Sequence, residues 1–86
     1  MIKISAKLIT NQKVKKTTTF ISVDEYESNK FYFYITEICR QLDLSTPIII
    51  NYHRECYEKF NSLSFTKDDF IDDFNYDSLF LENQEE

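Results

Sequence analysis

Glycine and tryptophan are absent from the 86 residues, proline occurs once and cysteine occurs twice. Without glycine the chain cannot form a Walker loop or a dinucleotide-binding turn, because both need Gly-rich backbone around a phosphate. An EF-hand loop also needs glycine at its sharp bend, so this class of calcium site is disfavoured. Every backbone position that requires a positive φ angle is expected to fall on Asn or Asp.

Long apolar runs are absent as well. No stretch approaches the roughly 18 apolar residues of a membrane-spanning helix. Residues 1–7 alternate polar and apolar side chains, whereas a signal peptide has a continuous apolar run after a basic start. Two cysteines, Cys39 and Cys56, are too few for the disulfide framework of a small secreted domain. We therefore expect a cytoplasmic protein without a membrane partner.

The composition that remains is that of a folded domain. Hydrophobic residues make up 42% of the chain and charged residues 29%, which is the ordinary globular range. Eight Phe and six Tyr supply large apolar areas to a chain too short to bury surface wastefully. We expect one globular domain over residues 1–82, with residues 83–86 as a frayed tail.

The N-terminal third predicts a β-hairpin. Apolar residues alternate with polar ones from Ile2 to Leu8, and residues 14–23 are rich in β-branched side chains. A turn is expected over residues 10–13, with Asn11 at positive φ. Two registers are open at this point: a two-residue turn would pair Leu8 with Lys15, and a three-residue turn would pair Ile4 with Phe20.

Helical periodicity follows the hairpin. Apolar residues recur at spacings of three and four over 31–42, which predicts a helix with one buried stripe. Thr46 and Pro47 suit the cap and first position of a second helix that continues toward Leu63, although residues 48–50 alone could instead form a short strand. A short third helix is expected from Thr66 through residue 74, and residues 76–82 have strand character.

Together these elements predict an α+β fold. The hairpin and the C-terminal strand would form a small sheet of about three strands, with two or three helices on one face. Charge is distributed unevenly along the chain, since residues 1–23 carry five lysines and no acid while residues 67–86 carry eight acids and one lysine. The acidic C-terminal part is therefore expected to lie near the basic hairpin.

Several short motifs resemble those of a set of short uncharacterised proteins from clostridia and related low-G+C bacteria. The similarity covers the opening residues 2–8, residues 37–39 with 42–44 before Pro47, and Phe65 with residues 68–70. Asn11-Gln12 stands where Asn-Gly is expected in that set. The resemblance implies a bacterial protein and brings no known activity with it.

His53, Cys56 and Cys39 are the candidates for a metal site or a Cys–His nucleophile. His53 and Cys56 lie three residues apart on one helical face, and thiolate and imidazole are ligands that zinc prefers. However, no Cys-x-x-Cys pair anchors a metal and no Gly-rich oxyanion hole accompanies a nucleophile. We interpret the three residues as packing residues, and expect no catalytic, cofactor-binding or metal-binding residue and no enzyme activity.

Acidic residues cluster in the predicted third helix. They form like-charged pairs four residues apart, and a further acid follows; the set is Asp68, Asp69, Asp72, Asp73 and Asp77. Such a cluster can simply face water, or it can bind a basic protein that normally grips nucleic acid. Direct nucleic-acid binding by the hairpin lysines is disfavoured, because the chain is acidic overall and the hairpin has no Arg and only one aromatic residue, Phe20.

The run Phe31-Tyr32-Phe33-Tyr34 is the most suggestive feature. One helix stripe cannot bury four consecutive rings, so Tyr32 and Phe33 are expected to point away from the sheet. Exposed rings are typical of binding surfaces. We therefore interpret the chain as a small non-enzymatic module that binds a protein partner or a second copy of itself. The first alternative is an acidic inhibitor or nucleic-acid mimic, and the second is a metal-binding or Cys/His enzyme.

Overall fold

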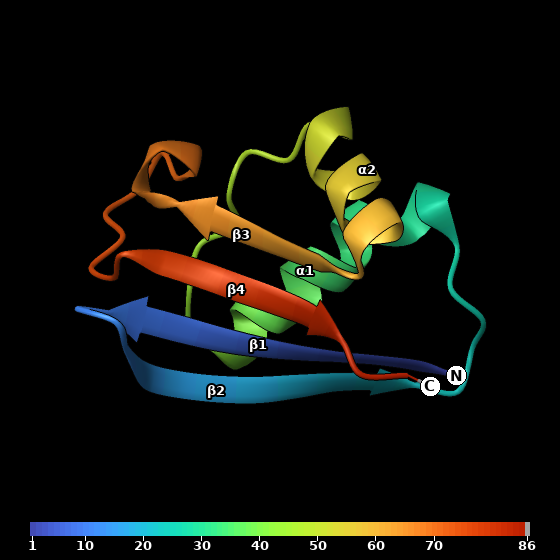
Figure 1. Ribbon diagram of the computed structural model, residues 1–86. Coiled ribbons are helices and arrows are strands. Elements are labelled where there is room, and N and C mark those ends of the chain that lie inside the picture. Colours follow the sequence, from blue (N-terminus) through green and yellow to red (C-terminus); the bar gives the residue numbers. More distant parts are fainter. Residues whose placement is uncertain (86) are drawn as a thin grey trace.

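The computed structural model describes residues 1–85 and shows a two-layer α+β fold (Figure 1). Four antiparallel strands form one sheet in the order β2-β1-β4-β3. α1 lies against one face of this sheet, and α2 lies beside its β3 edge. The elements are β1 (Ile2–Thr10), β2 (Lys13–Ser22), η1 (Ser28–Lys30), α1 (Phe31–Gln41), α2 (Asn51–Phe60), β3 (Ser62–Thr66), η2 (Lys67–Asp69) and β4 (Ser78–Asn83). The predicted fold class is confirmed, with one strand more than expected. Neither α-helix in residues 1–85 is long and apolar enough to cross a membrane.

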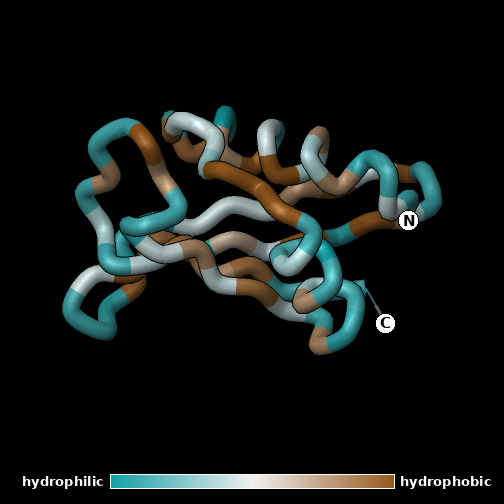
Figure 2. Tube along the Cα trace, turned by 90° about the horizontal axis from the view of Figure 1, so that it is seen from above, coloured by the Kyte–Doolittle hydropathy of each residue, from teal (hydrophilic) through white to brown (hydrophobic). Residues whose placement is uncertain are grey.

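The core lies between the inner face of the sheet and the helices. Alternation in β1 sends Ile4, Ala6 and Leu8 inward, where none of them retains exposed surface. Leu79 and Leu81 of β4 are equally buried beside them. Figure 2, which views the molecule from above, shows that hydrophilic residues dominate the loops at its ends. The apolar pattern read from residues 2–8 therefore identifies the inner face of the sheet.

The β1–β2 hairpin combines features of both registers left open by the sequence. Its turn has two residues, since Thr10 pairs with Lys13, yet Ile4 pairs with Phe20. A β-bulge between Leu8 and Ile9 makes this possible, because Lys15 is an extra residue between the partners of Ile9 and Leu8. The bulge keeps Phe20 on the inner face, where it is buried.

Positive φ angles occur at four residues of the described chain. Three are the expected Asn or Asp: Asn11 in the hairpin turn, Asp43 after α1 and Asn61 after α2. The prediction was wrong at Gln12, which has a φ of 65°. A two-residue hairpin turn of type I′ needs a left-handed backbone at both central positions, and the sequence has no glycine for the second one.

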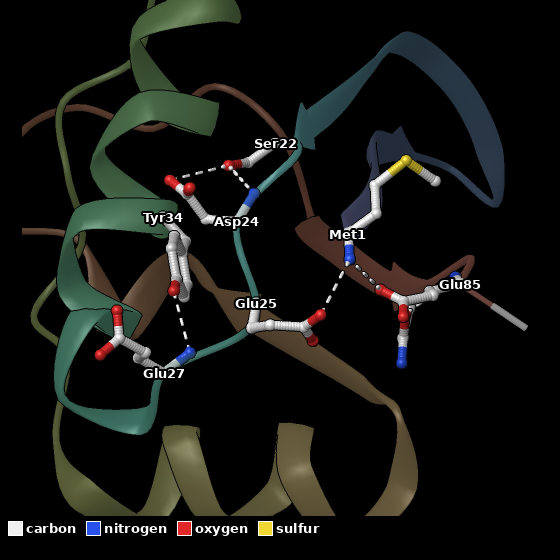
Figure 3. A network of polar contacts seen from close by, with 8 residues as sticks. Met1, Ser22, Asp24, Glu25, Glu27, Tyr34 and Glu85 are labelled. Atoms are coloured by element: carbon white, nitrogen blue, oxygen red, sulfur yellow. Dashed lines mark hydrogen bonds and ion pairs between the residues drawn. The ribbon is translucent and has the colours of Figure 1, made fainter.

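The first predicted helix is confirmed, and the linker before it is held by polar contacts. Phe31, Tyr34, Ile35, Ile38 and Cys39 are its buried residues. The buried Tyr34 hydroxyl accepts a hydrogen bond of 3.0 Å from the Glu27 N–H (Figure 3). The Met1 ammonium lies 4.0 Å from the Glu25 carboxylate and 3.9 Å from the Glu85 carboxylate, so Met1 lies between this linker and the C-terminal end of the described chain.

The second helix starts later and ends earlier than predicted. It begins at Asn51 rather than at Thr46-Pro47, and residues 48–50 are neither helix nor strand. The Ile48 N–H donates instead to the Asp69 carbonyl at 2.7 Å, outside any ladder. Asn61 adopts the left-handed conformation that ends the helix, so Leu63 belongs to β3 and not to the helical stripe.

The third predicted helix is wrong: it is reduced to the single turn η2, followed by irregular backbone to residue 77. The Asp69 carboxylate accepts the Thr66 N–H at 2.9 Å, which satisfies the start of the turn. Phe70 and Phe74 then stack on each other at 4.0 Å between ring centroids. A regular helix would place like charges at i,i+4 along its surface, and the irregular path avoids this.

β4 extends one residue beyond the expected strand, through Asn83. The Gln84 N–H also donates to the Lys3 carbonyl at 2.8 Å, so part of the segment expected to fray is bonded to β1. Glu86 lies outside the described residues.

Replacing Gln12 by glycine should stabilise the hairpin. A left-handed backbone costs less for glycine than for a residue with a Cβ, so we expect Gln12→Gly to raise the free energy of unfolding by about 0.5–1 kcal/mol. Chemical denaturation monitored by circular dichroism measures this change. Gln12→Ala is the matched control, because it removes the side chain but keeps the unfavourable φ. Equal stability of the two variants would contradict the explanation.

Candidate interaction surfaces

The two rings singled out in the sequence are exposed on α1. Tyr32 is 62% exposed and Phe33 is 54% exposed, while their neighbours Phe31 and Tyr34 are buried. Tyr32 also lines a hollow of about 270 Å³ together with Ile50, which is itself 55% exposed. We call Tyr32, Phe33 and Ile50 the Tyr32 surface. The sequence identified its rings, but Ile50 comes from a segment that no local pattern connected with α1.

The five acidic residues do not share one helix face. Asp69 bonds to Thr66, and Asp77 accepts the Asn11 N–H at 2.8 Å from across the hairpin turn. These two carboxylates therefore have partners within the fold. Asp68, Asp72 and Asp73 are exposed on the loop between β3 and β4.

The acidic C-terminal part lies against the basic hairpin, because β4 pairs with β1 and Asp77 bonds to the hairpin turn. Besides accepting the Asn11 N–H, Asp77 donates its own N–H to the Ile9 carbonyl at 2.8 Å. Its carboxylate lies 4.0 Å from the Lys67 ammonium. Asp77 thus holds the loop between β3 and β4 against the hairpin turn. This contact agrees with the expectation that the acidic C-terminal part lies near the basic hairpin.

His53 is an internal link between α2 and η2. It is only 6% exposed, and its ring lies 4.6 Å from the Phe65 ring. Nδ1 accepts the Ile50 N–H at 3.1 Å, so the ring proton of the neutral form is on Nε2, which lies 3.5 Å from an Asp69 carboxylate oxygen. These contacts hold the start of α2 against the end of β3.

The two cysteines differ in burial. Cys39 is completely buried on the inner side of α1, and burial raises the pKa of its thiol to about 11. A thiol with a raised pKa remains protonated at neutral pH and is a poor nucleophile and metal ligand. Cys56 is half-buried on α2, and both cysteines are free. Within residues 1–85 no three His, Cys, Asp or Glu side chains are grouped so as to hold a metal ion.

Glu58 is the centre of a polar network that sequence reasoning missed. Its carboxylate accepts hydrogen bonds from the hydroxyls of Ser28 and of Tyr26, the latter at 2.7 Å, and pairs with Arg54 at 3.1 Å. The Ser28 bond is the largest effect that lowers the pKa of Glu58, with Tyr26 and Arg54 acting in the same direction against desolvation. Burial and the Glu58 carboxylate raise the pKa of Tyr26.

This network borders a cavity of about 290 Å³ between α2 and the chain ends. Tyr57 lines it, and burial raises the pKa of this phenol to about 12. Asn83 closes part of the wall by donating its amide to the Asn61 side-chain oxygen at 3.3 Å. The lining residues come from positions far apart in the sequence, so no local motif could have predicted the cavity.

A second hollow runs between α2 and β3. Three residues at i, i+4 and i+8 form its helical side: Tyr52, Cys56 and Phe60. Tyr52 is 64% exposed and Phe60 62% exposed, and the hollow has a volume of about 340 Å³. Its other side is formed by β3 and by Phe80 of β4. We call this feature the α2–β3 groove.

Comparisons with protein-family models, with curated proteins and with solved structures found no match.

The Glu58 network should make stability depend on pH. Because the pKa of Glu58 is lowered in the folded state, its stabilising effect is present above the unfolded pKa and is lost as the pH falls through the folded pKa. We expect Glu58→Gln to be less stable than the wild type at neutral pH, with a difference that shrinks below about pH 4. Urea denaturation at several pH values measures it. A difference that stays constant from neutral to acidic pH would contradict the assignment.

Removing the His53 imidazole should destabilise the fold. His53→Ala leaves the Ile50 N–H without its acceptor and opens a space above Phe65, so the free energy of unfolding should fall by about 2–3 kcal/mol. Glu55→Ala, an exposed change on the same helix, should alter it by less than about 0.5 kcal/mol. Similar small effects of both changes in thermal denaturation would rule out the linking role of His53.

Proposed function

We propose that this chain is a non-enzymatic module that binds a protein partner through the Tyr32 surface. The observation that supports it most directly is the exposure of Tyr32, which lines a hollow with Ile50, and of Phe33 next to it in α1. Exposed rings next to a hollow are the usual anchors of a protein interface, because they bury much apolar area with little loss of conformational entropy.

The contrast with the buried rings of the chain strengthens this proposal. A short chain needs its aromatic residues for the core, and here the fully or nearly buried ones are Phe20, Phe31, Tyr34, Tyr57, Phe65 and Phe74. Tyr32 and Phe33 lie on α1 between two of these buried rings and still point outward. Burial against a partner would remove this apolar area from water, at about 25 cal/mol per Å².

The chemistry of the remaining candidates supports a binding role over a catalytic one. His53 is occupied by contacts inside the fold, and the raised pKa of Cys39 keeps its thiol protonated. We further propose a cytoplasmic location, where cysteines such as Cys39 and Cys56 stay reduced.

A photo-reactive amino acid at position 32 tests the proposal. Irradiation in cells of the host should give a covalent adduct with one defined protein, identified by mass spectrometry. The same amino acid at Thr19, which is exposed on β2, is the control and should give no such adduct. With the purified partner, the variant Tyr32→Ala/Phe33→Ala should bind at least about 30-fold more weakly, since losing one or two anchor rings costs about 2 kcal/mol or more.

The rival role as an acidic inhibitor makes the opposite forecast. In that case Asp68→Asn/Asp72→Asn/Asp73→Asn would abolish binding and the partner would be strongly basic, with salt-sensitive affinity. Unchanged binding by the Tyr32→Ala/Phe33→Ala variant, with its fold intact by circular dichroism, would refute the proposal made here.

A further inference from the structure

The cavity between α2 and the chain ends has negative charge on its walls and no positive charge. Glu58 of α2 and Glu85 after β4 both line this volume of about 290 Å³. Within residues 1–85, no lysine, arginine or histidine lines it. Two carboxylates at one hollow repel an anion and attract a cation. The walls therefore favour a positively charged ligand.

One polar side chain of this cavity is buried and has no partner. Tyr57 is only 5% exposed, and within residues 1–85 its hydroxyl makes no hydrogen bond. No polar atom sealed inside these residues lacks a partner, so the hydroxyl is not sealed and reaches the cavity that Tyr57 lines. Burial and, after it, the Glu85 carboxylate raise the pKa of this phenol, which places the carboxylate near the hydroxyl. A hydrogen bond left unmade at such a buried group is available to a ligand.

The Glu85 carboxylate also has acceptor capacity to spare. Its ion-pair partner, the Met1 ammonium, lies 3.9 Å away, which is beyond hydrogen-bond distance (Figure 3). An ionised carboxylate has two oxygens and only accepts hydrogen bonds. An ammonium group inside the cavity can therefore bond to Glu85 directly.

The aromatic walls suit the same kind of ligand. Tyr26 and Tyr57 both line the cavity, with ring centroids 5.9 Å apart. The hydroxyl of Tyr26 donates to Glu58 at 2.7 Å, which fixes this ring in the wall. The face of a tyrosine ring attracts a cation, and more strongly when water is partly excluded.

We propose that this cavity binds a small aliphatic amine in its ammonium form. The ammonium group donates hydrogen bonds to the Glu85 carboxylate and the Tyr57 hydroxyl, and Glu58 supplies a second negative charge. The volume is near the lower end of the range for ligand pockets, about 300 Å³, so the ligand has few atoms. A metal ion fits less well, because within residues 1–85 no three His, Cys, Asp or Glu side chains are grouped to hold one.

Titration calorimetry with putrescine, a four-carbon diamine, tests the proposal on the purified chain. At low ionic strength we expect saturable binding of one molecule per chain, because salt screens the attraction to the carboxylates. Butane-1,4-diol has the same length and no charge, and it should not bind at the same concentrations.

Two conservative variants locate the bound amine. Tyr57→Phe keeps the buried ring and removes only a hydroxyl without a partner, so the fold should retain its stability. Tyr57→Phe and Glu85→Gln should each weaken putrescine binding by at least about tenfold, since each removes a hydrogen bond to a charged group. Tyr52→Phe and Glu55→Gln are the matched controls on α2, outside the cavity, and should bind putrescine like the wild type.

Several results would overturn the proposal. A wild type without saturable putrescine binding would do so, and so would equal binding of butane-1,4-diol. Binding that both Tyr57→Phe and Glu85→Gln leave unchanged would place the amine elsewhere on the acidic surface. Tighter binding of Nα-acetyl-lysine amide than of putrescine would overturn the assignment to a free amine, by making the cavity a site for a protein lysine.

The two proposals are independent, because no lining residue is shared between this cavity and the hollow beside Tyr32. A cavity that does not bind putrescine leaves the partner of the Tyr32 surface untouched, and the absence of an adduct at position 32 leaves the amine site untouched.

Discussion

β1 is hydrogen-bonded on both sides, and the row Ile4, Ala6 and Leu8 on one of its faces is completely buried. Each side chain of this kind contributes about 1–3 kcal/mol when it is removed from water, but only if another layer covers it. α1 covers this face with five buried residues, and α2 adds the buried His53 and Tyr57 from its position beside β3. The opposite face of β1, with Lys3, Ser5 and Lys7, remains open to water.

This constraint explains which elements could be predicted from the sequence. The hairpin and α1 have long, regular patterns, and each pattern marks one side as inner. β3 was missed because Phe60 and Leu63 continue a helical spacing, and only the left-handed Asn61 between them separates helix from strand. The β-bulge was also hidden, since a single extra residue, Lys15, leaves no signature in composition.

The candidate surfaces were predictable to the extent that they arise from one element. Exposure of Tyr32 and Phe33 follows from the geometry of a helix with four consecutive rings. The α2–β3 groove and the Glu58 network instead join residues from separate segments, and their assembly depends on where β3 and η1 lie. No periodicity encodes such contacts, so they became visible only in the fold.

α2 separates the Tyr32 surface from the α2–β3 groove. Arg54 and Glu58 lie on its side toward η1 and the Tyr32 surface, whereas Tyr52 and Cys56 lie on its side toward the β3 edge. A partner bound at the Tyr32 surface would therefore leave the α2–β3 groove open.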